Sequence, residues 1–309
     1  MMNLPNLLRN VVLAPYTTYQ IGGPADLFLE VNTINELVEA VKYAREQKLP
    51  YFLLGTGANI LISDKGFRGL VILNRATKFE FLNPRSDLKS PQRSVLLRAE
   101  SGAVVADIIE ACKEKNLSGF EHFSGIPSSI GGALWQNLHF LNPERTDTFF
   151  IESILVEATI LDEENNIKKV EKDFFEFGYD DSILHHQEII VLDATFQLSE
   201  KPKEKIQKQI DANLLWRTQK QPQLWEYPSC GSVFKKIEGA GAGRLIEQAG
   251  LKGSQIGGAK ISEKHANYIM NTGNAKAADV LNLIDLVKKE VKEKLGYQME
   301  TEISLIGEK

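Results

Sequence analysis

The chain has 309 residues, of which 43% are hydrophobic and 25% charged, and its formal net charge is −5. This composition is typical of an ordinary globular protein with room for two domains, or for one with an appendage. The acidic balance and the lack of a basic stripe argue against a nucleic-acid partner. No apolar run approaches 18 residues and the first residues show no signal-peptide pattern, so we expect a cytoplasmic protein without membrane contact. The sequence leaves the oligomeric state open, and we expect a monomer.

The first half alternates short strands and amphipathic helices. Residues 27–31 read as a strand, and Thr33 with Glu36 forms a capping box that starts a helix. A second strand, 51–54, completes a β-α-β unit. Residues 83–94 are polar and read as a loop, followed by a strand at 95–99 and a helix that includes positions 104–112.

The second half contains strands near 153–161 and 188–198, and then a charged, Pro-containing stretch at 199–205. We expect a domain boundary there. Helices follow at about 203–219 and 244–250, and a longer one ends at Gly296, a favourable residue after a helix C-terminus. Residues 300–306 predict a last strand.

Three glycine-containing turns are candidate binding loops: Ile21–Ala25, Gly55–Asn59 and Gly125–Gly132. Glycine lets backbone N–H groups approach a diphosphate without a Cβ clash. None of the turns has the Walker or Rossmann pattern, and each taken singly reads as a plain connection. The three together favour a nucleotide diphosphate, with both interpretations open at this point.

Two adjacent carboxylates, Asp180 and Asp181, precede His185 and His186. If this segment is a strand, adjacent side chains point to opposite faces and the two histidines do not share a metal.

The two cysteines, Cys112 and Cys230, give no disulfide framework and no zinc spacing, so we expect reduced thiols and no metal site. On spacing alone, Glu300 and Glu302 share one face of a solvated edge strand.

Several motifs in this order resemble those of the UDP-N-acetylenolpyruvoylglucosamine reductase (MurB) family, and the resemblance covers nearly the whole chain. They are Tyr16–Ala25, Leu54–Leu61, Ser124–Asn137, Ser229–Lys235, Ala249–Glu263 and Met299–Ile303. The Ser-Cys-Gly-Ser form at Ser229–Ser232 is similar to the type II branch of the family.

The resemblance implies an α+β fold. It has an FAD-binding region of the vanillyl-alcohol-oxidase (PCMH) type in two subdomains, 1–75 and 76–199, and a C-terminal α+β substrate domain, 200–309. It also implies FAD as the cofactor, NADPH as co-substrate, and a small UDP-sugar as substrate. The implied reaction moves hydride from NADPH through FAD to the enolpyruvyl C3 of UDP-N-acetylglucosamine enolpyruvate, followed by protonation at C2.

The implied site residues fall into three groups. The catalytic group contains Ser232 as the proton donor, Glu302, and Asp180 at the position where the family has an arginine. The substrate group contains Tyr179, Lys235 and His265. The cofactor group consists of Gly55, Thr56, Gly57, Ala58, Asn59, Ile60, Gly125, Ile126, Pro127, Ser128, Ser129 and Gly132.

This chain departs from the family pattern in two places. A carboxylate at Asp180, about 4 Å from a developing enolate, would cost on the order of 4 kcal/mol at an effective dielectric near 20. The segment Gln136–Phe140 also replaces small residues near the flavin with His139 and Phe140. Three interpretations follow: a working reductase in which Arg217, Arg244 or Lys260 supplies the cation, a degenerate homologue that only binds its ligands, and a related flavin oxidase.

Overall fold

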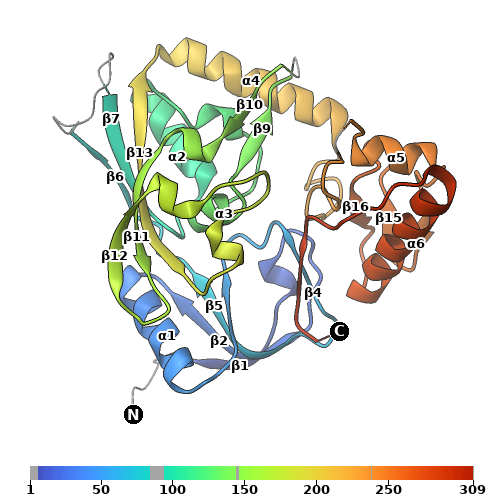
Figure 1. The fold of residues 1–309 in the computed structure, drawn as a ribbon, viewed down its shortest axis with the longest axis horizontal. Helices are drawn as coiled ribbons and strands as arrows, with labels where there is room; N and C mark the ends of the chain where they lie inside the picture. The colour runs from blue at the N-terminus through green and yellow to red at the C-terminus, as the bar shows by residue number, and fades with distance from the viewer. Residues whose placement is uncertain (1–5, 84–93, 144–145, 238, 309) are drawn as a thin grey trace.

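The computed structural model describes residues 6–83, 94–143, 146–237 and 239–308. Two sheet-based subdomains stack on one another, and a smaller helical and β-sheet domain lies beside both of them (Figure 1). The final segment returns from this smaller domain to the first subdomain, where the C-terminus lies close to β4 (Figure 1). Residues far apart in the sequence therefore meet between the three parts.

The first subdomain is a four-stranded sheet in the order β1-β2-β5-β3, with β1 antiparallel to β2 and the other pairs parallel. Helix α1 crosses between β2 and β3 and packs its apolar face on the sheet, so the predicted β-α-β unit is confirmed. The predicted capping box is also present, with Thr33 and Glu36 bonded reciprocally at the start of α1. The elements are β1 (Leu8–Val12), β2 (Pro24–Val31), α1 (Ile34–Glu46), β3 (Tyr51–Leu54), β4 (Ile60–Ile62) and β5 (Phe67–Asn74).

The second subdomain is an antiparallel sheet in the order β12-β11-β13-β7-β6, with β8 paired to one end of β13. Helices α2 and α3 contribute buried residues to its core, which explains the apolar spacing read from positions 104–112. Most of the predicted loop at 83–94 lies outside the described residues. The elements are β6 (Phe79–Leu82), β7 (Ser94–Glu100), α2 (Val105–Glu114), β8 (Leu117–Ser118), α3 (Ile130–Trp135), β9 (His139–Leu141), β10 (Thr148–Phe150), β11 (Leu155–Leu161), β12 (Ile167–Glu171) and β13 (Ile190–Glu200).

The third part packs two helices on a three-stranded antiparallel sheet. Its longer helix ends where the sequence predicts, because Gly296 adopts the left-handed conformation with φ 78°. Its core also takes in Tyr19, Ile21 and Leu61 from the first subdomain. The elements are α5 (Ala242–Gln248), β14 (Gln255–Ile256), β15 (Ala259–Ile261), β16 (Ile269–Asn271), α6 (Ala277–Leu295) and β17 (Ser304–Ile306).

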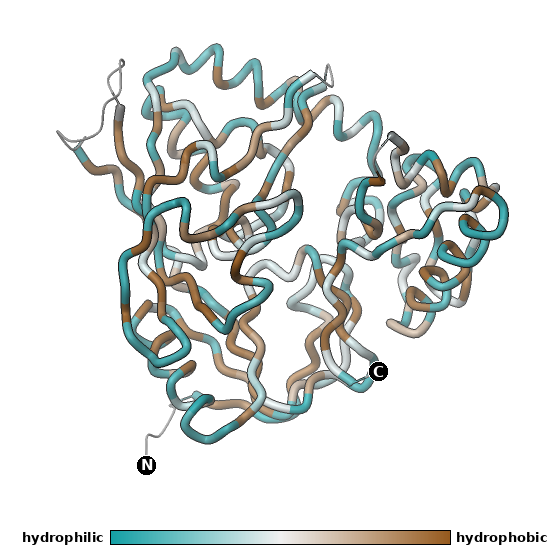
Figure 2. Tube along the Cα trace, in the orientation of Figure 1, coloured by the Kyte–Doolittle hydropathy of each residue, from teal (hydrophilic) through white to brown (hydrophobic). Residues whose placement is uncertain are grey.

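Helix α4 (Lys203–Lys220) links the second and third parts. Its residues Ile206 and Ile210 are buried in the core of the second subdomain, while most of its length is hydrophilic and faces outward (Figure 2). The division into 1–75, 76–199 and 200–309 remains a proposal, and the packing of α4 favours a third part that begins after residue 220.

Two local predictions are wrong. Only Ser304–Ile306 of the expected 300–306 strand forms a strand, β17, which pairs in parallel with β4. Residues 178–182 form a tight turn closed by the Gly178 N–H on the Asp181 carbonyl, 3.0 Å. His185 ends a short 3-10 helix, Ile183–His185, so the strand argument used for the histidine pair does not apply.

Candidate functional site

A large cavity of about 2110 Å³ lies where the three parts meet, and residues from all of them line it. Typical small-molecule pockets measure about 300–1,000 Å³, so this cavity has room for two ligands side by side. Its lining includes all twelve residues predicted to bind the cofactor, together with Tyr179, Asp180, Ser232, His265 and Glu302. The structure therefore brings most of the candidate site residues together.

The first glycine loop, residues 55–59, connects β3 to β4 along one wall of the cavity. Within the described residues, the backbone N–H groups of Thr56, Gly57, Ala58 and Asn59 donate no hydrogen bond. Gly57 is held in a left-handed conformation, φ 63°, and a Cβ there would lie 2.4 Å from the Tyr16 carbonyl oxygen. Successive free N–H groups on a lining loop form a concavity suited to an anion such as a diphosphate.

The second glycine loop, residues 125–132, leads into α3 and reaches the first loop. A Cβ on Gly55 would lie 2.5 Å from the Ser129 hydroxyl oxygen, so a larger residue there would have to displace this hydroxyl. The Ser129 hydroxyl accepts from the Gly132 N–H at the start of α3, 3.4 Å. The N–H groups of Ser128 and Ser129 likewise donate no hydrogen bond within the described part of the chain. The two loops together fit the diphosphate of a dinucleotide cofactor.

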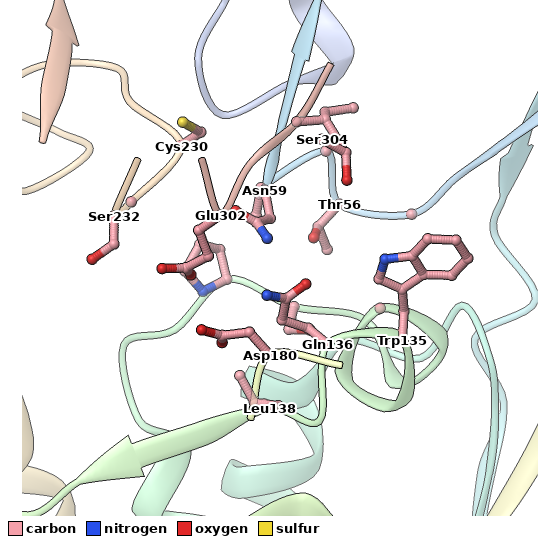
Figure 3. Close-up of a pocket in the computed structure, with 18 of the residues that line it drawn as sticks. Thr56, Asn59, Trp135, Gln136, Leu138, Asp180, Cys230, Ser232, Glu302 and Ser304 are labelled. Atoms are coloured by element: carbon pink, nitrogen blue, oxygen red, sulfur yellow. The ribbon is translucent and has the colours of Figure 1, made fainter. Parts of the chain in front are cut away.

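Ser232 and Glu302 belong to two segments that pair as a short antiparallel ladder. The Glu302 N–H donates to the Val233 carbonyl at 2.8 Å, and the Lys235 N–H donates to the Glu300 carbonyl at 2.9 Å. The pairing brings the segment that carries Ser232 next to the segment that carries Glu302, and both side chains line the same end of the cavity (Figure 3). Because the ladder is made by the backbone, the fold itself brings these two segments together.

The expectation that Glu300 and Glu302 share a solvated edge is wrong. Glu300 is exposed, whereas Glu302 is half-buried and lines the cavity. Burial and, to a smaller extent, the charge of Asp180 raise the pKa of Glu302, the charge of Lys235 lowers it, and the net result is a pKa of about 9. Glu302 therefore keeps its proton at neutral pH.

Asp180 lies at the tip of the tight turn, with φ 56°, and only 4% of its surface is exposed. Burial raises the pKa of its carboxyl, while His139, the Gln136 amide, Lys235 and His185 act to lower it. The His139 Nδ1 lies 3.7 Å from the Asp180 Oδ1. Asp180 thus enters the cavity from the second subdomain, opposite the Ser232–Glu302 ladder (Figure 3).

The predicted substrate residues differ in position. Tyr179 lines the cavity with half of its surface exposed, and its ring lies 4.5 Å from the His139 ring. His265 lines the wall formed by the third part. Lys235 is exposed and does not line the cavity, but its charge acts on both Asp180 and Glu302.

Three cations were candidates to compensate for Asp180. Lys260 lies outside the cavity and pairs with Glu263 at 2.9 Å. Arg244 is exposed at the cavity wall. Arg217 lines the cavity, and within the described chain its buried Nε has no hydrogen-bond partner. None of the three is among the groups that shift the pKa of Asp180 or Glu302, whereas Lys235 is.

The site also contains residues that the sequence did not single out. Gln136 hydrogen-bonds to Asp180, and Ser304 on β17 lines the wall near the first glycine loop. Phe140 is buried and packs edge-on against Trp216, with ring centroids 5.9 Å apart. The only sequence signal for Gln136 was its place in the departing segment, and Ser304 gave none.

Both cysteines are free and buried. Burial raises the pKa of the Cys112 thiol to about 12 and raises that of Cys230 as well, so neither is a ready nucleophile.

His185 and His186 both lie near Asp181. The His185 Nδ1 is 3.8 Å and the His186 Nε2 is 3.2 Å from the Asp181 Oδ1. No group of three or more metal-ligating side chains occurs among the residues that the structure describes. Within the same residues, no helix is both long and apolar enough to cross a membrane.

The α+β fold and the paired glycine loops define a flavin-binding protein, and residues 25–170 match the model of the FAD binding domain. Residues 221–306 match the C-terminal domain of UDP-N-acetylenolpyruvoylglucosamine reductase. The chain belongs to the UDP-N-acetylenolpyruvoylglucosamine reductase family, as its full-length relatives show.

Two relatives carry that name. The protein from Caldanaerobacter subterraneus subsp. tengcongensis is 40% identical over 98% of this chain and 94% of its own length. The protein from Clostridium novyi is 36% identical over 97% of this chain and 92% of its own length. The crystal structure of the reductase from Thermus caldophilus matches with a TM-score of 0.75 and 31% identity, and covers 96% of this chain and 97% of that one. The predicted fold class is confirmed.

Proposed function

We propose that this protein is an FAD-containing, NADPH-dependent oxidoreductase that converts UDP-N-acetylglucosamine enolpyruvate to UDP-N-acetylmuramate in peptidoglycan synthesis. The full-length similarity to reductases of that name supports the reaction. The observation that carries the proposal is the single cavity, because it joins two loops suited to a dinucleotide with the Ser232–Glu302 ladder of the third part.

When bound, FAD supplies hydride transfer from NADPH to the enolpyruvyl C3. We assign its diphosphate to the N–H groups of Thr56–Asn59 and to those of Ser128 and Ser129, which donate no hydrogen bond among the described residues. These donors come from two loops that approach each other at Gly55 and Ser129, so they can donate hydrogen bonds to one ligand from two sides. The other cofactor-group residues, Ile60 and Gly125–Pro127, line the same wall.

Ser232 is assigned as the donor of the proton to C2. A neutral hydroxyl is a weak acid and needs neighbours that stabilise the charge it leaves behind. We assign this role to the protonated Glu302 and to the charge of Lys235, which acts on Glu302 and belongs to the same backbone ladder. We assign Lys235, Tyr179, His265 and Arg217 to the UDP-sugar, whose diphosphate needs cations and donors. The buried Nε of Arg217 has no hydrogen-bond partner among the described residues.

The test is an assay on the purified protein. We expect flavin absorbance, and NADPH oxidation that depends on added UDP-N-acetylglucosamine enolpyruvate and yields UDP-N-acetylmuramate. Oxidation of NADPH with oxygen alone would favour a flavin oxidase. A protein that binds FAD and the UDP-sugar but forms no product would be the degenerate homologue, and one that takes up no FAD would contradict the proposal.

We also propose a cytoplasmic monomer. The substrate and NADPH are cytoplasmic metabolites, and the two reduced, buried thiols fit a reducing compartment. Fractionation of the source cells and light scattering of the purified protein test the two statements separately.

A further inference from the structure

Two carboxyl groups face each other across the reaction end of the cavity. Asp180 comes from the tight turn of the second subdomain and Glu302 from the ladder of the third part, and both point into the same space beside the Gln136 amide (Figure 3). The charge of Asp180 raises the pKa of Glu302. Two carboxyls that line one cavity and interact in this way do not both ionise readily, because like charges raise the cost of the second ionisation.

The surroundings of the two carboxyls are unequal. Four groups stabilise the charged form of Asp180 and so lower its pKa: His139, the Gln136 amide, Lys235 and His185. The His139 Nδ1 lies 3.7 Å from the Asp180 Oδ1. Among the described residues, Lys235 is the group whose charge lowers the pKa of Glu302, and Glu302 also acts on the uncharged Tyr179, Cys230 and Tyr268. Negative charge is therefore better stabilised on Asp180, and a single shared proton is better placed on Glu302.

We propose that Asp180 and Glu302 form an acid pair that holds one proton, with Glu302 as the neutral acid that hydrogen-bonds to the carboxylate of the substrate and Asp180 as the positioning residue that keeps the proton there. The inference rests on the proposed function, since it takes the enolpyruvyl carboxylate as its ligand. A carboxylic acid held neutral in an apolar site is a known way to donate a hydrogen bond to developing negative charge.

The pair matters most after hydride has been added at C3. The electron pair of the former double bond then spreads from C2 onto the substrate carboxylate. The Glu302 O–H donates a hydrogen bond to the oxygen that gains this charge and keeps its proton, while the C2–H bond forms with the proton of Ser232. With Glu302 neutral, Asp180 anionic and Lys235 cationic, these three groups sum to no net charge, whereas an ionised Glu302 would repel the substrate.

The test measures binding of the product, UDP-N-acetylmuramate, to the FAD-loaded protein by calorimetry from neutral to alkaline pH. In the wild type we expect affinity to be level at first and then to fall about tenfold per pH unit above about pH 9, where Glu302 ionises. UDP-N-acetylglucosamine has the same uracil and diphosphate but no carboxylate. Its affinity should therefore not show the part of the decrease above about pH 9 that comes from repulsion between the ligand carboxylate and ionised Glu302.

Asp180→Asn removes the charge that opposes ionisation of Glu302. Asparagine also tolerates the left-handed backbone at this position. The pH above which product affinity falls should therefore be lower by about one unit, although Glu302, the side chain that titrates, is unchanged. Glu302→Gln keeps a donor that cannot ionise, so the fall specific to the carboxylate should disappear. The matched control is Asp181→Asn, because Asp181 is the adjacent carboxylate, pairs with His186 and does not line the cavity.

An unchanged profile in Asp180→Asn, or a fall that persists in Glu302→Gln, would overturn the acid pair while the proposed function stands. A shift of equal size in Asp181→Asn would also overturn it, by showing a general charge effect. Failure of the FAD-loaded wild type to bind the product at any pH would instead defeat the proposed function, and the acid pair with it. Flavin absorbance and circular dichroism of each variant confirm that the fold and the cofactor are retained.

Discussion

The carboxylate of Asp64 caps a helix that belongs to another part of the molecule. Its two oxygens accept from the backbone N–H groups of Ala277, at 2.8 Å, and Ala278, at 3.0 Å, in the first turn of α6. Asp64 follows β4 in the first subdomain, so this contact ties the third part to the glycine-loop region. A negative group at a helix N-terminus also favours the helix dipole.

Asp64→Ala should therefore lower the free energy of unfolding by about 1–2 kcal/mol, the usual cost of losing a helix cap. Urea unfolding of the two proteins measures the difference. Asp107→Ala is the matched control, because Asp107 is an exposed acidic residue in the first turn of α2. If both variants lose the same stability, the contact between the two parts contributes nothing of its own.

Gly57 should be required for cofactor retention. A Cβ at this position would lie 2.4 Å from the Tyr16 carbonyl oxygen, so Gly57→Ala must displace the loop whose free N–H groups we assign to FAD. We expect about tenfold weaker FAD binding or more, measured by flavin fluorescence after dilution.

Gly250→Ala separates this effect from backbone strain. Gly250 also has a positive φ, 79°, but a Cβ added there would meet nothing within 4 Å, and the residue does not line the cavity. This variant should lose about 1 kcal/mol of stability and keep its flavin. Equal flavin loss in both variants would contradict a specific role for Gly57.

How far the sequence predicts this structure depends on the range of the interactions. The capping box at Thr33 and the helix end at Gly296 are local, and both are where the sequence places them. Glu300 and Glu302 have the same local pattern but different environments, because only Glu302 lies where the three parts meet and lines the cavity, whereas Glu300 is exposed. Asp180 was assigned from the family motif, yet its position opposite Glu302 depends on how two distant segments fold together.

The histidine pair shows the same limit. Excluding a shared metal rested on strand geometry, whereas the structure has a turn and a 3-10 helix at this point. His185 instead hydrogen-bonds to the Trp135 carbonyl oxygen at 2.8 Å and stacks on the Trp135 ring. That contact joins residues that lie close in sequence to the two departures from the family pattern, Asp180 and Gln136–Phe140, and no local rule indicates it.

Ser232→Ala should separate the two halves of the reaction. The variant loses the hydroxyl assigned to C2 protonation but none of the residues assigned to FAD. Flavin reduction by NADPH should keep its rate in stopped-flow measurements, and formation of UDP-N-acetylmuramate should fall by a factor of about 10² or more. Equal loss of both steps would mean that Ser232 has another role.

Glu121 should make folding sensitive to acid. Its buried carboxylate accepts from the Gly119 N–H at 2.7 Å, the Ser118 hydroxyl at 2.5 Å and the Lys201 ammonium at 3.0 Å. Burial alone would raise the pKa of Glu121, but these donors hold it below the ordinary value of 4.5. Because the folded state favours the charged form, its contribution is present above about pH 4.5 and is lost as the pH falls through the lower folded-state pKa.

Glu121→Gln should therefore reduce the free energy of unfolding by about 2 kcal/mol at neutral pH, since it weakens three buried hydrogen bonds to a charged acceptor. Urea unfolding at neutral and acidic pH should show the deficit shrinking as the wild-type carboxylate becomes protonated. Glu114→Gln is the control, because Glu114 also pairs with a lysine, Lys203, but in full contact with solvent. Its loss should be much smaller at every pH, and a deficit in Glu121→Gln that stays constant with pH would contradict the assigned charge.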